Sequence, residues 1–197
     1  MLRHSRGFSV IELMVTITLL ALLLGVALPS FRTWIRNAQV RTVSDGLQTG
    51  LRTAQAEAIR RHRQVVFYLS NDSTCTAATA ATSNGAFWVV RTVPLMSGEA
   101  AEALQCGHLG DVASGVAIAA DATALCFNSG GRQVANADPG LGGGIACVLD
   151  NTGTSRFNLS SSGADRPLRV LVTLGGSVRL CDPAKTLSAS TPDGCPA

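Results

Sequence analysis

The sequence predicts an α+β protein in which one long N-terminal helix packs against an antiparallel β-sheet. Two observations lead to this fold class. Residues 8–61 carry apolar side chains at helical spacing, first as a continuous run and then as a stripe. From residue 64 onward, short apolar runs alternate with clusters of Gly, Ser, Asn and Asp, as in strands joined by turns. Four segments are expected: a basic leader (1–7), an apolar helix (8–28), an amphipathic continuation (29–63) and a strand-rich domain (64–197).

The composition limits the class of protein. Of the 197 residues, 46% are hydrophobic and 15% are charged, whereas average chains carry about 25% charged residues. The shortage is concentrated in residues 8–28, where Glu12 is the only ionisable group. A disordered or collagen-like chain is excluded. The net charge of +3 is too small to indicate a nucleic-acid partner by itself, so any basic partner surface must be local.

The apolar segment 8–28 has about the length that an α-helix needs to cross a bilayer. A cleaved secretory signal is the alternative, but its apolar part is shorter, excludes acids and ends in small residues. Here Glu12 lies inside the segment and Pro29 follows it. A carboxylate within a membrane helix costs about 2.5–3.5 kcal/mol, so Glu12 requires a partner or a role. Arginines lie on both sides of the segment, and the positive-inside rule therefore does not assign its orientation.

Three features coincide at the N-terminus: the basic leader that ends at Gly7, Phe8 directly after it, and Glu12 at the fifth position counted from Phe8. This pattern, Gly-Phe-Ser-Val-Ile-Glu before an apolar helix, resembles the class III signal of type IV pilins and type II secretion pseudopilins. The resemblance implies cleavage between Gly7 and Phe8 by a prepilin peptidase, methylation of the new amino group, and membrane storage before assembly. It further implies that Glu12 meets the cationic N-terminal amine of a neighbouring subunit and sets the register between them.

The helical pattern resumes after Pro29. Apolar residues recur at steps of three to five: Phe31, Trp34, Ile35, Ala38, Val43, Leu47, Leu51, Ala54 and Ala58. Most charged residues avoid this stripe, which is predicted to face the core of the domain rather than a cofactor. A helix over residues 8–61 would be about 80 Å long. Gly25 and Pro29 mark where it is expected to bend or locally melt.

Seven candidate strands follow the helix, at residues 65–69, 87–93, 116–120, 125–128, 156–160, 168–174 and 178–181. Loops are expected at 76–85 and 137–144, with a flexible one at 160–163. In the last hairpin, a two-residue Gly-Gly turn would mix the two faces, so a three-residue loop, Gly175-Gly176-Ser177, is predicted. That loop pairs Leu174 with Val178 and Val172 with Leu180. It places three residues together on the outer face: Arg169, Thr173 and Arg179.

The six cysteines all lie in the C-terminal two thirds: Cys75, Cys106, Cys126, Cys147, Cys181 and Cys195. An even number after a membrane-directed segment predicts up to three disulfides in an oxidising compartment, and the alternative is reduced cysteines in a cytosolic core. Cys181 with Cys195 is the favoured pair, which would stabilise the fold by about 3 kcal/mol. Cys126 with Cys147 comes next and leaves Cys75 with Cys106, although sequence alone does not decide the connectivity.

The strand-rich domain and its late Gly-x-x-Arg-Leu-Cys-Asp-Pro segment are similar to the GspH/FimT family of minor pilins. This resemblance implies a subunit of a type IV pilus that helps assembly or initiation, with other pilin subunits and an inner-membrane assembly platform as partners. The alternative is a GspH-type minor pseudopilin of a type II secretion system. The expected location is the bacterial inner membrane as a single-pass protein with a periplasmic domain, and the extracellular filament after assembly.

DNA is a further candidate partner. Some FimT-type members bind DNA during natural transformation through a C-terminal Gly-Arg-x-Arg motif. The matching positions start at Gly176, and Ser177 replaces the first arginine, so only Arg179 carries over. Three other cations are candidate phosphate contacts: Arg166, Arg169 and Lys185. The alternative is that these side chains form an ordinary solvated face.

Catalysis finds little support in the sequence. The chain lacks a phosphate-binding Gly-x-x-x-x-Gly-Lys loop, a Ser-x-x-Lys motif and a Gly-x-Ser-x-Gly motif. His62 and His108 are isolated in sequence, and no Cys-x-x-Cys pair is present to suggest a metal site. The sequence therefore predicts a structural or binding protein without a catalytic site, cofactor or metal.

Overall fold

The computed structural model describes residues 9–96, 98–110 and 115–196. These residues form one helix, α1 (Val10–Arg61), and two five-stranded sheets. The first sheet has the order β3-β2-β1-β5-β6, and its strands are β1 (Val65–Ser70), β2 (Phe87–Thr92), β3 (Ala103–His108), β5 (Ala124–Phe127) and β6 (Gln133–Val134). The second has the order β10-β9-β8-β7-β4, and its strands are β4 (Ala117–Ala120), β7 (Ser155–Ser160), β8 (Leu168–Val172), β9 (Val178–Thr186) and β10 (Gly194–Cys195).

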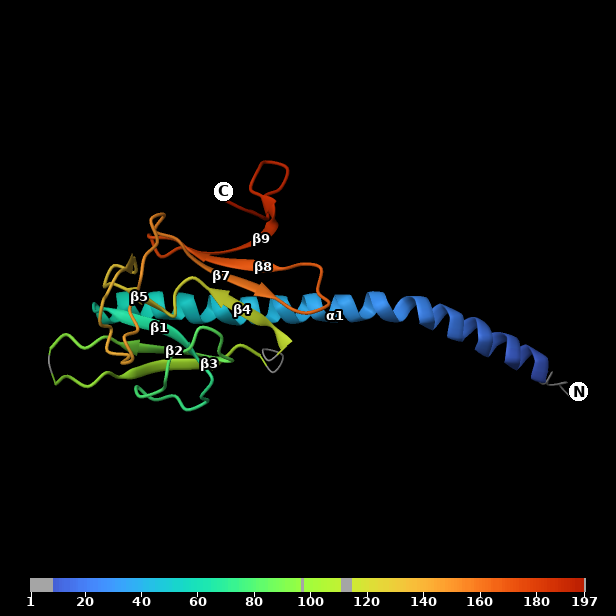
Figure 1. The fold of residues 1–197 in the computed structure, drawn as a ribbon, viewed down its shortest axis with the longest axis horizontal. Coiled ribbons are helices and arrows are strands. Elements are labelled where there is room, and N and C mark those ends of the chain that lie inside the picture. The colour runs from blue at the N-terminus through green and yellow to red at the C-terminus, as the bar shows by residue number, and fades with distance from the viewer. Residues whose placement is uncertain (1–8, 97, 111–114, 197) are drawn as a thin grey trace, which may run out of the picture.

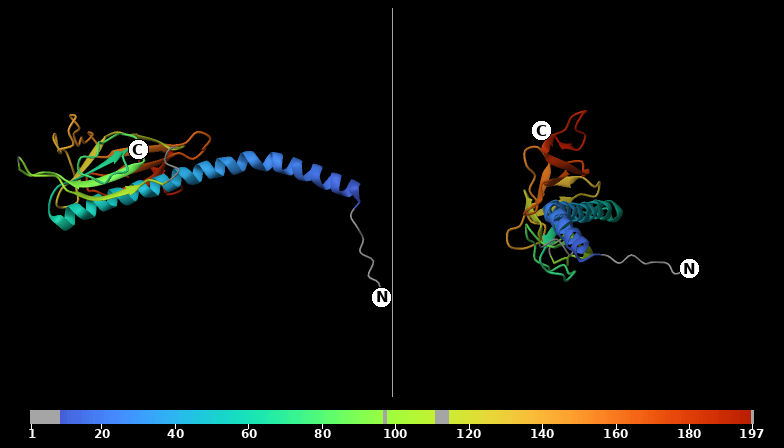
Figure 2. Two further views of the ribbon diagram at one scale, coloured as in Figure 1. Left: turned by 90° about the horizontal axis from the view of Figure 1, so that it is seen from below. Right: turned by 90° about the vertical axis from the view of Figure 1, so that its right-hand side faces the viewer.

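Helix α1 has two halves with different surroundings. Its second half lies along both sheets, and its first half projects from the domain (Figure 1). The projecting half is curved (Figure 2). The helix nevertheless continues through Pro29, so the expected local melting there does not occur. It ends at His62, whose left-handed conformation directs its N–H to the carbonyls of Ala58 and Ile59.

The core lies between the second half of α1 and the inner faces of both sheets. Six helix side chains spaced by three or four residues are fully buried there: Val40, Val43, Leu47, Leu51, Ala54 and Ala58. Phe67 on β1 and Phe157 on β7 meet edge to face across the two sheets, with ring centroids 6.5 Å apart. Gly50 permits the close approach of the first sheet, because a Cβ there would lie 2.8 Å from Trp88 and 2.9 Å from Phe67.

The predicted apolar stripe is correct for its second part and wrong for its first. Val43 through Ala58 face the core, but Phe31, Trp34 and Ile35 are exposed, as is Ala38. Trp34 precedes Val43 by nine residues, which is two and a half helical turns, so the two side chains point to opposite sides. The predicted stripe passed from Ala38 to Val43 by a step of five residues, and this step crosses from one face of the helix to another.

The strands also differ from the expectation of one antiparallel sheet. They divide into two sheets, and β10 pairs with β9 in parallel. Of the strands that the sequence did not predict, β3 has no β-branched residue and is defined by antiparallel pairing with β2. Its Gly107 leaves room for the indole of Trp88. Tertiary pairing rather than local propensity therefore creates this strand.

The register of the last hairpin differs from the predicted one by two residues. Val172 pairs with Val178, and Val170 pairs with Leu180. The loop is Leu174-Gly175-Gly176, closed by a hydrogen bond from the N–H of Gly176 to the carbonyl of Thr173 (2.8 Å). Its third residue requires positive φ, which Gly176 adopts at 85°, whereas the predicted loop would have put Ser177 there. A shift of two keeps the faces unchanged, so Arg169 and Arg179 still share one face of the β8–β9 pair.

All six cysteines form disulfides, and the favoured pairing is confirmed. The bonds join Cys75 to Cys106, Cys126 to Cys147 and Cys181 to Cys195. The last of these encloses the C-terminal tail, which packs over Leu171 on the outer face of the second sheet.

Candidate functional site

The first candidate site is the projecting half of α1. An 18-residue window of this helix has a mean hydropathy of 2.5, and none of that window is buried within the structure. The large apolar side chains that the structure describes between Val10 and Leu28 are 50% to 77% exposed. The length and composition of this half are those of a helix able to cross a membrane. Such a surface requires lipid or other protein to cover it.

Glu12 lies in the first turn of α1, and its side chain is exposed. The two threonines of this half satisfy their hydroxyls within the helix, because Thr16 and Thr18 donate to the carbonyls of Leu13 and Val15 at 2.9 Å. The Glu12 carboxylate has no hydrogen bond or ion pair with any described residue. The expected cleavage site, Gly7 and Phe8, lies outside the described residues.

The second candidate site comprises the four cations near the β8–β9 hairpin. Three of them lie on β8 and β9 and Arg166 lies on the loop before β8, but not all four side chains are free of hydrogen bonds within the described residues. Arg169 donates from Nε to Oδ1 of Asn158 (2.6 Å). Arg179 donates to the carbonyl of Pro192 (3.1 Å). Arg166 is exposed on the loop between β7 and β8.

Lys185 is held by two carboxylates, one on its own strand β9 and one in the C-terminal tail. Its Nζ lies 2.5 Å from Asp193 and 3.5 Å from Asp182. The hydrogen bond between Lys185 and Asp193 raises the pKa of Lys185 and lowers the pKa of Asp193. Local negative charge therefore offsets the charge of Lys185, which makes this side chain a weaker candidate for phosphate contact than Arg166.

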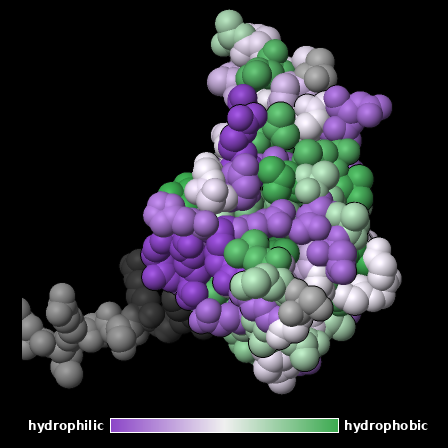
Figure 3. All heavy atoms as spheres, turned by 90° about the vertical axis from the view of Figure 1, so that its left-hand side faces the viewer, coloured by the Kyte–Doolittle hydropathy of each residue, from purple (hydrophilic) through white to green (hydrophobic). Residues whose placement is uncertain are grey.

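The end of the domain at the C-terminus of α1, far from the projecting half, holds charged groups that the sequence did not single out. Figure 3 views this end, where hydrophilic and hydrophobic side chains are interspersed. Glu57 receives hydrogen bonds from Arg60 (2.6 Å) and Arg61 (3.1 Å), and Arg61 also binds Glu102 (2.9 Å). The hydrogen bond from Arg60 is the largest cause that lowers the pKa of Glu57. Spacing along the helix could have indicated the Glu57 pairs, but the contact with Glu102 depends on the fold.

Arg91 is a second group that the sequence reasoning missed. It is 4% exposed, and it donates to the carbonyls of Ala77 and Pro139 from two different loops. Its guanidinium carbon lies 6.0 Å from the ring centroid of Tyr68. Burial lowers the pKa of Arg91 and raises that of Tyr68. This arrangement fastens two loops to the outer face of the first sheet.

Two histidines, His62 and His108, lie within the described residues. His62 ends α1, and the ring of His108 packs against Phe87 with centroids 4.8 Å apart. In the described ranges, no three His, Cys, Asp or Glu side chains are placed to hold a metal ion.

Two family profiles match the sequence. The prokaryotic N-terminal methylation motif covers residues 2–28, and the type II transport protein GspH family covers residues 44–190. A curated fimbrial protein of Moraxella nonliquefaciens is 41% identical over 51 residues, which are 24% of this chain and 33% of that protein. The chain thus matches about a third of the length of this relative.

Solved structures of three proteins resemble the fold. The type IV minor pilin FimU of Pseudomonas aeruginosa has a TM-score of 0.47 at 16% identity over 73% of this chain and 96% of that chain. The minor pseudopilin EpsH from the type 2 secretion system of Vibrio cholerae has a TM-score of 0.46 at 12% identity over 75% and 99%. GspH of E. coli has a TM-score of 0.46 at 11% identity over 77% and 94%.

Proposed function

Because this chain belongs to the GspH family and carries the N-terminal methylation motif, we propose that it is a minor pilin of a type IV pilus. In this proposal a prepilin peptidase removes residues 1–7, and the new amino group of Phe8 is methylated. Residues 8–28 hold the subunit in the inner membrane, with residues 29–63 and the domain 64–197 on the periplasmic side. An inner-membrane platform then inserts the subunit into a filament beside other pilins. Arg3 and Arg6 leave with the leader, so the mature net charge falls from +3 to +1.

The observation that carries this proposal is the exposed apolar helix with one carboxylate that has no partner among the described residues. A simple membrane anchor gains nothing from Glu12, because a charge in apolar surroundings is unfavourable without a partner. An assembly helix can use it, since a cationic N-terminal amine on a neighbouring subunit would neutralise it and fix the stagger between subunits. We therefore assign Glu12 to subunit assembly and Gly7 and Phe8 to processing.

The test replaces Glu12 with Ala in the full chain and uses Thr16→Ala as the matched control, because the hydroxyl of Thr16 is already bonded within its own helix. The amounts of cleaved subunit in membranes and in sheared filaments are measured by immunoblot. Glu12→Ala should leave cleavage largely intact and lower incorporation at least tenfold, while the control behaves as wild type. Normal incorporation of Glu12→Ala overturns the assigned role.

The alternative is a minor pseudopilin of a type II secretion system. The exposed helix serves either machine, so the two are separated by deletion of the gene. Loss of surface pili with normal protein secretion supports the pilus, and the reverse result supports the secretion system.

DNA capture is a second candidate function of the same subunit. Its support is that Arg169 and Arg179 share one face of the β8–β9 pair, with Arg166 exposed nearby. A mobility shift at low salt tests it, and Arg166→Gln should weaken binding more than Lys185→Gln, because Lys185 is already paired with two carboxylates. Absence of binding at low salt, or binding unchanged by Arg169→Gln with Arg179→Gln, removes this function.

A further inference from the structure

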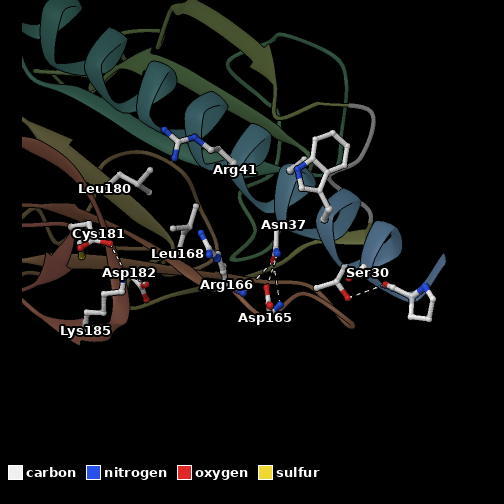
Figure 4. A pocket seen from close by; sticks show the side chains of 15 residues that line it. Ser30, Asn37, Arg41, Asp165, Arg166, Leu168, Leu180, Cys181, Asp182 and Lys185 are labelled. Carbon is white, nitrogen blue, oxygen red and sulfur yellow. Dashed lines mark hydrogen bonds and ion pairs between the residues drawn. The ribbon is translucent and has the colours of Figure 1, made fainter. Parts of the chain in front are cut away.

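A short stretch of α1 connects the projecting half of the helix to the domain. The loop between β7 and β8 is fastened to the helix at Asn37 (Figure 4). Oδ1 of Asn37 accepts hydrogen bonds from the backbone N–H groups of Asp165 (3.2 Å) and Arg166 (3.1 Å). At a rise of about 1.5 Å per residue, Asn37 lies only about 13 Å beyond Leu28. The stretch between Leu28 and Asn37 therefore joins the apolar segment to the domain.

Two aromatic rings of this stretch lie at the depth of a membrane interface. Val10 to Leu28 is about 29 Å long, close to the roughly 30 Å thickness of a bilayer core, and the interfacial layer adds about 5–8 Å on each side. The backbone of Phe31 lies about 4.5 Å beyond Leu28, and that of Trp34 about 9 Å. Helical side chains lean toward the N-terminus, and the ring of Trp34 stacks on that of Phe31 with centroids 5.8 Å apart. Both rings therefore fall within the interfacial layer when the segment spans a membrane.

The charge pattern indicates the same boundary independently. No charged residue lies between Glu12 and Arg32, so Arg32 is the first cation after the apolar segment. Its side chain is exposed, and its backbone lies about 6 Å beyond Leu28, between the depths of the two rings. A span that ended farther along the helix would draw Arg32 into hydrocarbon, which is unfavourable. The hydrocarbon core is therefore expected to end before Arg32.

The chain itself leaves both rings largely uncovered. Phe31 is 56% exposed and Trp34 is 64% exposed, although they are among the largest apolar groups of the chain. Trp34 also borders the groove between α1 and the β8–β9 region, where cations and carboxylates are equal in number: Arg41, Arg166 and Lys185 against Asp165, Asp182 and Asp193. Electrostatic attraction to lipid is therefore not expected from the groove. The rings themselves suit a membrane interface, where Trp is enriched because its ring is apolar and its N–H is polar.

We propose that Phe31 and Trp34, which we call the aromatic anchor, lie in the interfacial layer of the periplasmic leaflet and fix the depth of α1 in the membrane. This inference rests on the proposed membrane storage of the subunit. The anchor requires no anionic lipid, because neutral phospholipid offers the same boundary between hydrocarbon and water. Because Asn37 ties the domain to the helix directly after the anchor, a fixed helix depth also fixes the height of the domain above the membrane. Transfer of the subunit into a filament must then remove both rings from the interface.

The first test measures depth with a tryptophan at three positions of α1 in bilayers of neutral phosphatidylcholine. The full chain keeps Trp34, or carries Trp34→Phe together with Leu20→Trp or Thr49→Trp, and all three positions are exposed. The other tryptophan, Trp88, is 7% exposed, and its emission is subtracted with Trp34→Phe alone. Bromines high on the acyl chain should quench Trp34 at least about threefold more than bromines at the chain end. The order should reverse for Leu20→Trp, and the aqueous quencher acrylamide should act most on Thr49→Trp.

The second test asks whether the two rings hold the helix at this depth. Ser30→Cys places a thiol directly before the anchor, and the native cysteines are all in disulfides. Phe31→Ala with Trp34→Ala should raise the labelling of this thiol by a membrane-impermeant maleimide at least about threefold. The matched control, Leu95→Ala with Met96→Ala, removes a comparably exposed apolar pair on the loop between β2 and β3 and should leave labelling unchanged. Equal labelling of the two double variants overturns the anchor.

Three quenching results also overturn the anchor alone. Acrylamide quenching of Trp34 as strong as that of Thr49→Trp places the ring in water, and stronger quenching by bromines at the chain end places it in the core. Lipid quenching of Trp34 that falls as the ratio of protein to lipid rises assigns the rings to a second copy. In all three cases Leu20→Trp is still quenched by lipid. Absence of that quenching at both bromine depths overturns the proposed membrane storage, and the anchor with it.

Discussion

The two halves of α1 belong to one continuous helix, but they have opposite surroundings. Between Val10 and Leu28 the apolar residues occupy all sides of the helix, and the described ones are exposed. Between Val40 and Ala58 the apolar residues form one face, and that face is buried by the chain's own sheets. A helix that is apolar all round must be covered by lipid or by several neighbours, whereas a one-sided stripe can be covered by a single domain. The distribution of apolar residues along α1 thus distinguishes the half that must be covered from outside the chain from the half that packs in the chain's own core.

The two halves of α1 should differ most in how much the free energy of unfolding falls when a leucine is truncated to alanine. Leu47→Ala removes a fully buried side chain and should lower the free energy of unfolding by about 2–5 kcal/mol. Leu20→Ala, at a position that is 58% exposed, should change it by less than about 0.5 kcal/mol. Denaturant unfolding of the full chain in detergent micelles measures both. Similar losses at the two positions would show that the first half takes part in the fold of the domain.

A smaller difference is expected when a methyl group is added to a helical glycine. Gly50→Ala places a Cβ against Trp88 and Phe67 and should destabilise by about 1–3 kcal/mol. Gly25→Ala meets nothing within 4 Å and should leave stability unchanged or raise it by up to about 1 kcal/mol. Thermal unfolding followed by the emission of Trp88 distinguishes them, and a stable Gly50→Ala variant would contradict the close packing of the helix on the first sheet.

The smallest expected difference concerns the carboxylates. The folded state lowers the pKa of Glu57, so its ion pairs stabilise the fold above the unfolded pKa of about 4.3, and this stabilisation is lost as pH falls through the folded pKa. Glu57→Gln should therefore lower stability at pH 7 by at most about 1 kcal/mol, and this loss should shrink as the pH falls below the unfolded pKa. Glu12→Gln should have no effect on unfolding of the domain at pH 7. A Glu57→Gln penalty that stays the same as the pH falls would contradict the ion-pair explanation.

The sequence predicted the long helix and most strands because each depends on a local pattern. The disulfides that the structure forms are the pairs that the sequence favoured, although cysteine spacing alone did not decide the connectivity. The sequence did not predict that Phe31 and Trp34 are exposed, since a five-residue step within an apparent stripe moved them to the other side of the helix. The predicted register of the last hairpin was wrong for a similarly local reason. The third residue of the loop requires positive φ, and Gly176 rather than Ser177 occupies that position.

The remaining differences depend on contacts between distant segments. Strand β3 is built on pairing with β2, and the two sheets share one core against the same face of α1. Among the candidate site residues, the sequence identified the cations near the last hairpin. It did not reveal that Lys185 is paired with Asp193, because that contact forms only when the tail folds back.

The most direct test of the central claim asks whether neighbouring subunits cover the first half of α1 in the filament. The native cysteines are all in disulfides, so a cysteine introduced at Leu20 is a unique free thiol, and one introduced at Thr49, which is exposed, is its control. Labelling with a small maleimide is compared between denatured subunits and sheared filaments free of membrane. We expect the Leu20→Cys thiol to be protected at least tenfold in filaments while Thr49→Cys remains reactive. Equal labelling of Leu20→Cys in filaments and in denatured subunits would contradict the account.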